Sequence, residues 1–258
     1  MKSLFGRIIF RISKLILHKF GFNIKLGDYQ AQYPELNKGE LDFLKSVLAA
    51  SITMTSFESL TTLALACKYV VKNRITGDFV EAGVWRGGSS IVAKKFLTGE
   101  RSFYLFDTYA GMTKPTIHDY RVGASSNTST VEHWKNQSKS THNEWVFASL
   151  EEVEKHFRSF KLLDGSINFI KGNVLKTLLS SNLPKKISLL RLDTDFYDST
   201  LIELQVLWPR LVSGGILILD DYGHWDGARR AVDEYFQNEK DLFMVPIAGG
   251  GGRIILKQ

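Results

Sequence analysis

The chain has 258 residues, of which 44% are hydrophobic, so it is long enough to bury a full core and fits one domain built on a single sheet. Its formal net charge is +6, but the first 25 residues hold six basic residues and no acid, and the remainder balances 27 basic against 27 acidic residues. A body without net charge argues against a nucleic-acid partner, because binding to phosphates needs clustered cations on the folded surface. The single cysteine, Cys67, lies in an apolar run, which leaves no disulfide or cysteine metal site within the chain and favours a cytoplasmic setting.

The N-terminal segment, residues 1–27, has the pattern of a basic amphipathic helix. Cations interrupt its apolar residues every three or four positions, so it contains neither the apolar core of a signal peptide nor a membrane span of about 20 residues. One side of a helical wheel collects Phe5, Ile9, Ile12, Ile16 and Phe20, and the opposite side collects Arg7, Arg11, Lys14 and His18. Such a helix can dock on the body or on a second subunit of a homo-oligomer, or lie on the inner face of the membrane, and the sequence leaves these alternatives open.

Residues 28–258 are expected to form one α/β domain. Apolar residues recur at helical spacing from Leu41 to Asn73, which predicts two helices before the sheet. Beyond them, predicted strands at 78–84, 103–106, 166–171, 187–193 and 216–220 alternate with predicted helices at 87–97, 149–160, 197–210 and 226–238. This alternation predicts a doubly wound, mostly parallel sheet covered on both faces, with ligands bound beyond the carboxyl ends of its strands. The segments 242–247 and 253–256, joined by a glycine turn, are expected to add an antiparallel hairpin and complete seven strands.

Residues 109–148 differ in character from the rest of the domain. They are rich in Ser, Thr, Asn, His and Lys and contain no long periodic run. Loops of more than about 15 residues are unusual in compact domains unless they are lids or binding loops. We interpret this segment as a lid over the active site; the alternative is a disordered insertion.

The first candidate site residues stand in the glycine-rich turn from Glu81 to Gly88. An acid occupies the place where a dinucleotide fingerprint would have its first glycine, and a pyrophosphate disfavours a nearby carboxylate. A positively charged sulfonium amino acid tolerates that carboxylate, while Gly83 and Gly87 let the backbone approach the ligand closely. The turn therefore favours S-adenosylmethionine over a nicotinamide dinucleotide as cofactor.

Two further residues at predicted strand ends fit an adenosine cofactor. Asp107 stands 26 residues after Glu81, where an acid would accept hydrogen bonds from ribose hydroxyls, although an ordinary turn residue fits the same place. Asn173 follows the third strand and either touches the adenine or caps a helix. The sequence leaves both interpretations open.

Four aspartates form the most specific pattern in the sequence. Asp193 and Asp195 end the fourth predicted strand, Asp220 and Asp221 end the fifth, and residues two apart in an extended segment point to the same side. Four carboxylates at adjoining strand ends repel one another unless a cation lies among them, and Mg²⁺ is the simplest such cation. The alternative is that these aspartates only cap the helices that follow.

These charges also suggest how an alcohol could be methylated. An alcohol is a poor nucleophile, so the site must align it with the methyl group and remove its proton. A metal bound to the acceptor oxygen lowers the pKa of that hydroxyl, and a neighbouring carboxylate can take the proton. We assign the metal to Asp193, Asp220 and Asp221 and the proton to Asp195, with His224 as a competing base candidate.

At these residues the sequence resembles the macrocin O-methyltransferase family, the TylF and MycF type. The resemblance runs from about Met54 to Phe236 and rests on GDFVEAGVWRGGSS (77–90), FDTYAGM (106–112), RLDTDFYDST (191–200) and DDYGHWDGARRAVDE (220–234). It implies a Rossmann-like class I methyltransferase fold, S-adenosylmethionine, magnesium and a lid after the second strand. It also implies methylation of sugar hydroxyls on antibiotics or related glycosides, and a membrane-bound N-terminus would suit a surface-glycan or lipid-linked sugar.

The resemblance carries site residues as well. Aspartates at the positions of Asp193, Asp220 and Asp221 resemble the family's metal ligands, and Asp195 resembles its proton acceptor. Thr55 and Ser56 fall in a segment that in the family reaches the methionine end of the cofactor. The expected cofactor contacts are Thr55, Ser56, Glu81, Gly83, Val84, Trp85, Arg86, Ser89, Asp107, Thr108, Gly172, Asn173 and Asp193, and the expected substrate contacts are Tyr222 and His224.

Two other functions remain as alternatives at the level of sequence. An NAD-linked sugar dehydrogenase would have a glycine in place of Glu81 and a Tyr-Lys or Cys catalytic set, which the sequence does not offer. A non-catalytic nucleotide-binding module would use its acids only as helix caps.

Overall fold

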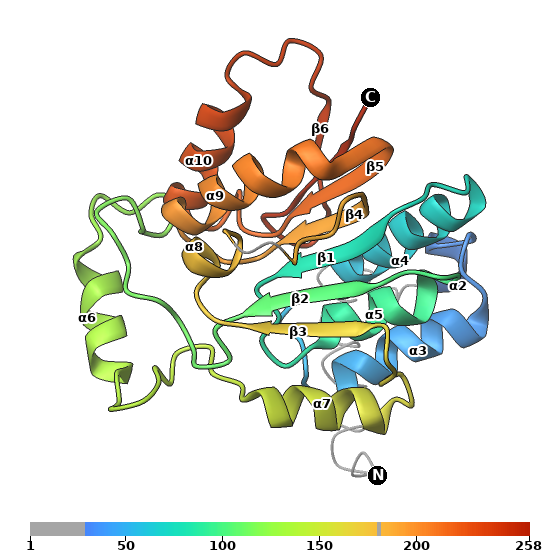
Figure 1. Cartoon of the computed structure of the whole chain (residues 1–258), viewed down its shortest axis with the longest axis horizontal. Coiled ribbons are helices and arrows are strands. Elements are labelled where there is room, and N and C mark those ends of the chain that lie inside the picture. The colour runs from blue at the N-terminus through green and yellow to red at the C-terminus, as the bar shows by residue number, and fades with distance from the viewer. Residues whose placement is uncertain (1–28, 180–181) are drawn as a thin grey trace, which may run out of the picture. The chain divides into compact units, whose positions relative to one another are not determined.

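The computed structural model describes residues 29–179 and 182–258, and the basic segment predicted at residues 1–27 lies outside them. The chain divides into two compact units, residues 1–43 and 44–258. The described part of the first holds α2 (Tyr29–Gln32) and the start of α3 (Lys38–Ala49). The second unit carries the sheet and the candidate site (Figure 1).

Seven strands form one sheet in the order β3-β2-β1-β4-β5-β7-β6 (Figure 1). The first five strands are parallel to one another, and β7 pairs antiparallel with both β5 and β6. Their bounds are β1 (Asp78–Ala82), β2 (Phe103–Asp107), β3 (Ile167–Lys171), β4 (Ile187–Leu192), β5 (Leu211–Leu219), β6 (Met244–Pro246) and β7 (Arg253–Leu256). This confirms the predicted doubly wound, mostly parallel seven-stranded sheet with its C-terminal hairpin.

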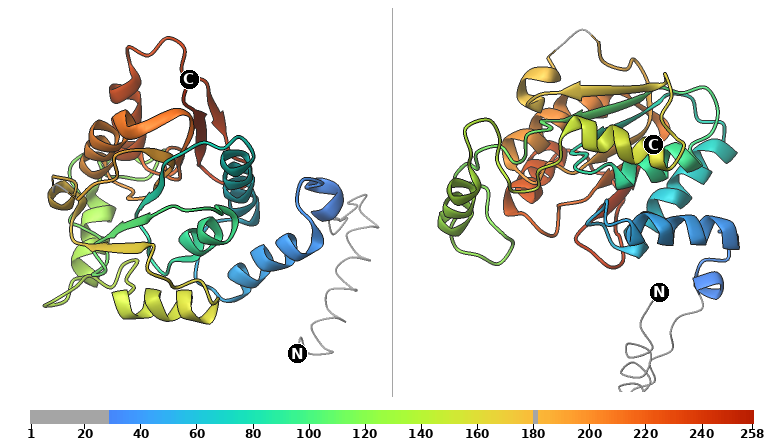
Figure 2. Two further views of the ribbon diagram at one scale, coloured as in Figure 1. Left: turned by 45° about the vertical axis from the view of Figure 1, so that its right-hand side comes forward. Right: turned by 90° about the horizontal axis from the view of Figure 1, so that it is seen from below.

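Helices cover both faces of this sheet. In the left panel of Figure 2, α4 and α5 lie to one side of the strands, and α8 to α10 lie to the other. Their bounds are α4 (Phe57–Lys72), α5 (Gly88–Phe96), α6 (Thr128–Gln137), α7 (Leu150–Ser159), α8 (Val174–Thr177), α9 (Tyr197–Leu207) and α10 (Asp226–Phe236). Leu190 and Leu192 of β4 join one core with Leu204 and Leu207 of α9, while α4 contacts β4 and β5. All six residues of β4 are buried, as a parallel strand covered on both faces requires.

Some boundaries differ from those predicted. β5 begins at Leu211 rather than at residue 216, and α9 ends at Leu207, before a 3-10 turn (Trp208–Arg210) that contains Pro209. A proline inside a helix lacks the N–H that the helical ladder needs, which explains the early end of α9. Within the described residues, no helix has both the length and the hydropathy that a bilayer crossing requires.

The predicted lid segment contains a regular element that its composition concealed. Helix α6 begins at Thr128 and ends at Gln137, inside residues 109–148. Its ten residues include only two large apolar side chains, Val131 and Trp134, so the sequence shows no helical periodicity there.

Candidate active site

The carboxyl ends of β4 and β5 bring the predicted acids together. Leu192 of β4 pairs with Leu219 of β5, so the residues that follow them, Asp193 and Asp220, are neighbours. A cavity of about 510 Å³ lies at these strand ends, and all four predicted aspartates line it. The cavity is therefore where the sequence placed it, beyond the carboxyl ends of the strands.

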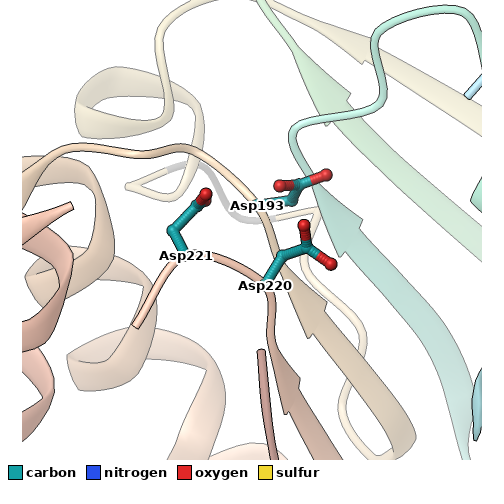
Figure 3. A group of neighbouring side chains, drawn as sticks. All are labelled: Asp193, Asp220 and Asp221. Carbon is teal, nitrogen blue, oxygen red and sulfur yellow. The ribbon is translucent and has the colours of Figure 1, made fainter. Parts of the chain in front are cut away.

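Three of the aspartates converge. Asp193, Asp220 and Asp221 each offer one carboxylate oxygen, and these three oxygens lie within 4.8 Å of one another. Figure 3 shows the three side chains projecting from two adjacent strand ends into a common space. Asp221 is 7% exposed, so its charge is largely shielded from water.

Asp195 lies against this group in an unusual backbone conformation. Its φ angle is +66°, and its backbone N–H donates a hydrogen bond of 3.1 Å to Oδ2 of Asp221. Burial, together with the negative charge of Asp193, raises the pKa of Asp195 to about 7. A carboxylate with a pKa near neutrality is suited to accept a proton in a reaction.

A buried arginine also lies among these acids. The Arg191 side chain is 3% exposed, and its guanidinium contacts Glu81, Asp193 and Asp220, each at 2.7 Å. Burial disfavours its charge, but the carboxylates outweigh burial and raise the pKa of Arg191 well above its usual value. The arginine is therefore a permanent cation, and it neutralises one of the several negative charges present.

The remaining charge and geometry fit a hard divalent ion. Arg191 engages Oδ2 of Asp193 and Oδ1 of Asp220, which leaves each of these carboxylates a second oxygen. Opposite ligands of Mg²⁺ lie about 4 Å apart at its short bond lengths, and one oxygen each of Asp193, Asp220 and Asp221 lies within 4.8 Å of the others, which is close to that spacing. One guanidinium does not balance these three carboxylates and Glu81, and a bound divalent cation would offset most of the surplus negative charge.

The glycine turn is held against β4 and β2. Gly83 has a φ angle of +85°, and a Cβ added there would lie 1.9 Å from the backbone oxygen of Asp193. The N–H groups of Val84 and Trp85 donate to Oδ2 of Asp107 at 2.7 and 3.0 Å. Asp107 therefore fixes the turn that the sequence assigned to the cofactor, and it still lines the cavity.

Most of the predicted site residues line the cavity. Those that do are Thr55, Gly83, Val84, Trp85, Ser89, Asp107, Thr108, Asn173, Asp193, Asp195, Asp220, Asp221 and His224. The side chain of Asn173 accepts from the N–H of Leu175, so it caps α8 as well as bordering the cavity.

Five predicted residues do not line the cavity: Ser56, Glu81, Arg86, Gly172 and Tyr222. Ser56 caps α4, Arg86 pairs with Glu152 at 2.9 Å, and the Tyr222 hydroxyl donates to Asp233. Glu81 is fully buried and binds Arg191 and Ser90, so the charge in the turn holds Arg191 instead of facing the cavity.

An aromatic wall was not predicted. Trp145, Phe196 and Trp225 line the cavity with ring centroids 5.5 to 6.1 Å apart, and the Arg121 guanidinium lies 4.2 Å from the centroid of the Trp225 ring. Phe196 directly follows Asp195, which could have suggested an apolar surface beside the acids. Trp145 gives no such local signal, because only the fold brings it to the site.

The segment predicted as a lid contributes to this cavity. Met112, Lys114, Arg121 and Trp145 line it. The backbone of residues 120–122 is hydrogen-bonded to residues 224–226, through Val122 N–H to the His224 carbonyl and Asp226 N–H to the Tyr120 carbonyl, both at 2.9 Å. This part of residues 109–148 is thus a wall of the cavity.

Comparison with known proteins agrees with this geometry. The family described as macrocin O-methyltransferase (TylF) matches residues 44–247. The chain is 34% identical over 187 residues to 8-demethyl-8-(2,3-dimethoxy-alpha-L-rhamnosyl)-tetracenomycin-C 4'-O-methyltransferase of Streptomyces olivaceus, covering 71% of this chain and 67% of that protein. It is 30% identical to mycinamicin III 3''-O-methyltransferase of Micromonospora griseorubida, covering 71% and 69%.

A solved structure shows the same relationship. The O-methyltransferase NovP superposes with a TM-score of 0.67 and 28% identity, covering 80% of this chain and 82% of that one. These matches decide against the NAD-linked dehydrogenase and the non-catalytic module. With a family match that spans most of the sheet and the whole cavity, the chain belongs to the macrocin O-methyltransferase (TylF) family and is an S-adenosylmethionine-dependent O-methyltransferase.

Proposed function

We propose that this enzyme methylates a hydroxyl of a sugar, on a glycosylated natural product or on a surface-glycan or nucleotide-sugar intermediate, with the assistance of Mg²⁺. The names of its relatives support the acceptor, since one describes 4'-O-methylation of a tetracenomycin that carries a rhamnosyl group. The observation that carries the proposal is the meeting of Asp193, Asp220 and Asp221 within 4.8 Å, in the cavity that Asp195 also lines.

The residues divide the chemistry between them. Asp193, Asp220 and Asp221 would hold the ion, which when bound supplies a Lewis acid that lowers the pKa of a hydroxyl oxygen near it. As the O–C bond to the methyl group forms, the C–S bond breaks and the sulfur keeps the electron pair. The proton of the acceptor hydroxyl passes to a carboxylate oxygen of Asp195, and the neutral thioether leaves.

The cavity also orients the two reactants. Gly83, Val84, Ser89 and Asp107 border the end assigned to the cofactor, beside the glycine turn. Trp145, Phe196 and Trp225 provide the apolar wall on which the less polar face of a sugar ring can rest. The acceptor hydroxyl would then lie between Asp195 and the methyl group, and this alignment supplies much of the rate enhancement.

We predict that Asp195→Asn lowers kcat by about 100-fold or more, because removal of a positioned base typically costs 10² to 10⁴. Asparagine tolerates the positive φ angle of this position, so the fold is expected to survive. The measurements are turnover with labelled S-adenosylmethionine on a panel of nucleotide sugars and glycosides, and the affinity for S-adenosylhomocysteine by calorimetry.

Asp226→Asn is the matched control, since Asp226 begins α10 and does not line the cavity. Its activity should stay near that of the native enzyme. Near-native turnover of Asp195→Asn, with the control also active, would remove Asp195 from the role of base.

The N-terminal segment and the assembly state belong to the proposal as well. We propose a cytoplasmic homo-oligomer whose residues 1–25, with six cations and no acid, hold it at the inner face of the membrane. The full chain should then sediment with anionic vesicles at low salt and be released at high salt. Equal recovery with uncharged vesicles would contradict this.

A further inference from the structure

Arg191 joins the acid cluster to a second part of the cavity. Besides its three carboxylate partners, its Nη2 donates to Oγ1 of Thr55 at 3.2 Å. Thr55 is 136 residues away in sequence and stands in the loop just before α4. One buried side chain thus contacts the end of β1, the ends of β4 and β5, and this loop.

The loop before α4 also borders the cavity. Ile52, Thr53, Met54 and Thr55 all line it, near the glycine turn. The carbonyl of Ile52 accepts from the N–H of Gly88 at 3.0 Å, and the N–H of Thr55 donates to Oγ1 of Thr53 at 3.1 Å. A ligand seated at the glycine turn would therefore touch the same short loop that holds Arg191.

Glu81 holds the other side of the Arg191 guanidinium. Nη1 donates to Oε1 of Glu81, and the second oxygen of Glu81 accepts from the hydroxyl of Ser90 on α5. With Glu81 on one side and Thr55 on the other, Arg191 has a defined position from which it holds one oxygen each of Asp193 and Asp220. Arg191 thereby fixes the orientation of both carboxylates and leaves the second oxygen of each without a bond to it.

We propose that Arg191 is a positioning residue that couples the two ligand sites of the cavity. A cofactor that orders the loop at Thr55 also fixes Arg191 and, through it, the carboxylates of Asp193 and Asp220. The two carboxylates then lose less conformational freedom when the ion binds, so the cofactor raises the affinity for the ion, and by linkage the ion raises the affinity for the cofactor equally. This inference rests on the proposed function, because it requires both ligands to bind in this cavity.

The test uses Thr55→Val, which removes one hydroxyl and leaves Arg191 and every carboxylate in place. Thr62→Val is the matched control, since the Thr62 hydroxyl donates to the carbonyl of Glu58 on α4 and does not line the cavity. For each protein, calorimetry measures the dissociation constant of MgCl₂ alone and in saturating S-adenosylhomocysteine. The ratio of the two constants reports the coupling, whatever the affinity for either ligand alone.

In the native enzyme and in Thr62→Val, we expect Mg²⁺ to bind at least about fivefold more tightly in the presence of S-adenosylhomocysteine. In Thr55→Val, Mg²⁺ should still bind alone, but the ratio should fall close to one. The coupling would be overturned if Thr55→Val showed the same ratio of dissociation constants as the native enzyme, or if the native enzyme itself showed a ratio of one. Either result would leave the proposed function intact. If S-adenosylhomocysteine binds but Mg²⁺ does not, the inference and the metal part of the proposed function both fail.

Discussion

Gly83 shows how closely the cofactor turn approaches the neighbouring strand. Its φ angle of +85° lies in the left-handed region, and a Cβ there would come within 1.9 Å of the Asp193 backbone oxygen. Gly123 has a similar φ angle of +90°, with nothing within 4 Å of an added Cβ. Alanine substitutions at these two glycines therefore separate the free-energy cost of the backbone conformation from the free-energy cost of steric crowding.

We predict that Gly123→Ala lowers the free energy of unfolding by about 1 to 2 kcal/mol, the usual cost of a left-handed alanine. Gly83→Ala should cost a further 1 to 3 kcal/mol or so, because β4 must move. Urea denaturation of the two variants measures both values. Equal losses would mean that the turn can shift away from Asp193 without cost.

Glu203 offers a pH-dependent test of a buried carboxyl near the site. It is fully buried, one of its oxygens accepts from the Thr194 hydroxyl at 2.9 Å, and burial raises its pKa from 4.5 to about 8. Because the folded pKa is higher than the unfolded one, the favourable contribution of the neutral acid is complete below about pH 4.5. It is lost as the pH rises through about 8.

We therefore predict that Glu203→Gln becomes more stable relative to the native enzyme as the pH rises from 5 to 8. The difference should grow by up to about 1.4 kcal/mol for each pH unit. Urea denaturation of both proteins across this range measures it. A difference that stays constant with pH would show that Glu203 ionises normally in the folded chain.

At the level of single residues, the sequence predicted where the aspartates lie but not that Arg191 pairs with Glu81 beside them. The positions of Asp193, Asp195, Asp220 and Asp221 follow from the ends of two predicted strands, which are local properties. The period of two does not apply to Asp195, because β4 ends at Leu192 and Asp195 has a φ angle of +66°. The pairing of Arg191 with Glu81 spans 110 residues and depends on the register between β1 and β4, which no local pattern contains. The sequence therefore contained no sign that Glu81, which the glycine turn assigned to the cofactor, contacts Arg191 and does not line the cavity.

At the scale of elements, a residue of the insertion after β2 caps the N-terminus of α9. The N-cap residue of α9, Phe196, has no side-chain oxygen to offer. Asp119, which is fully buried, supplies one: its Oδ1 accepts from the N–H of Tyr197 at 2.8 Å, and its Oδ2 accepts from the N–H of Thr116 at 2.6 Å. Since α9 begins at Tyr197, two residues after Asp195, this cap also fixes the turn that carries the proposed base.

We predict that Asp119→Ala lowers the free energy of unfolding by about 2 kcal/mol, the upper range for loss of an N-cap. It should also lower kcat, because the turn at Asp195 loses its anchor. Asp119→Asn keeps an acceptor for the Tyr197 N–H and should lose less of both quantities. Denaturation and turnover measurements test this, and full activity of the alanine variant would argue against any link between the cap and the base.

Some helices and strands follow from the local sequence, and others do not. The strands and the long helices follow from their apolar periods, and the helix predicted at 149–160 is α7, which Ser149 caps. Helix α6 and the docking of residues 120–122 on residues 224–226 were not predictable, because they depend on polar segments that are ordered only by tertiary contacts.

At the scale of the whole molecule, ligand binding should be visible as stability. A ligand present at about 100 times its dissociation constant stabilises the folded state by about 2.7 kcal/mol. For a domain of this size we predict that S-adenosylhomocysteine at that level raises Tm by about 5 to 10 °C. Thermal denaturation with NAD at the same concentration is the control and should show no shift. A shift with NAD alone would contradict the cofactor assignment.

The architecture as a whole was predicted from sequence because alternation of strands and helices leaves few topologies. The residues that form the aromatic side of the cavity were not predicted, since Met112 and Trp145 come from an insertion whose path the sheet does not dictate.

The cavity thus has two walls of different origin. The carboxylates and the glycine turn sit on strand ends, where any shift would disturb the central sheet, while part of the facing wall comes from residues 109–148. Relatives can therefore diverge in the molecules they modify by altering the cavity-facing residues of this segment, such as Met112 and Trp145, as long as Asp119 is kept to cap α9. Grafting that segment between two such enzymes should transfer acceptor preference along with it.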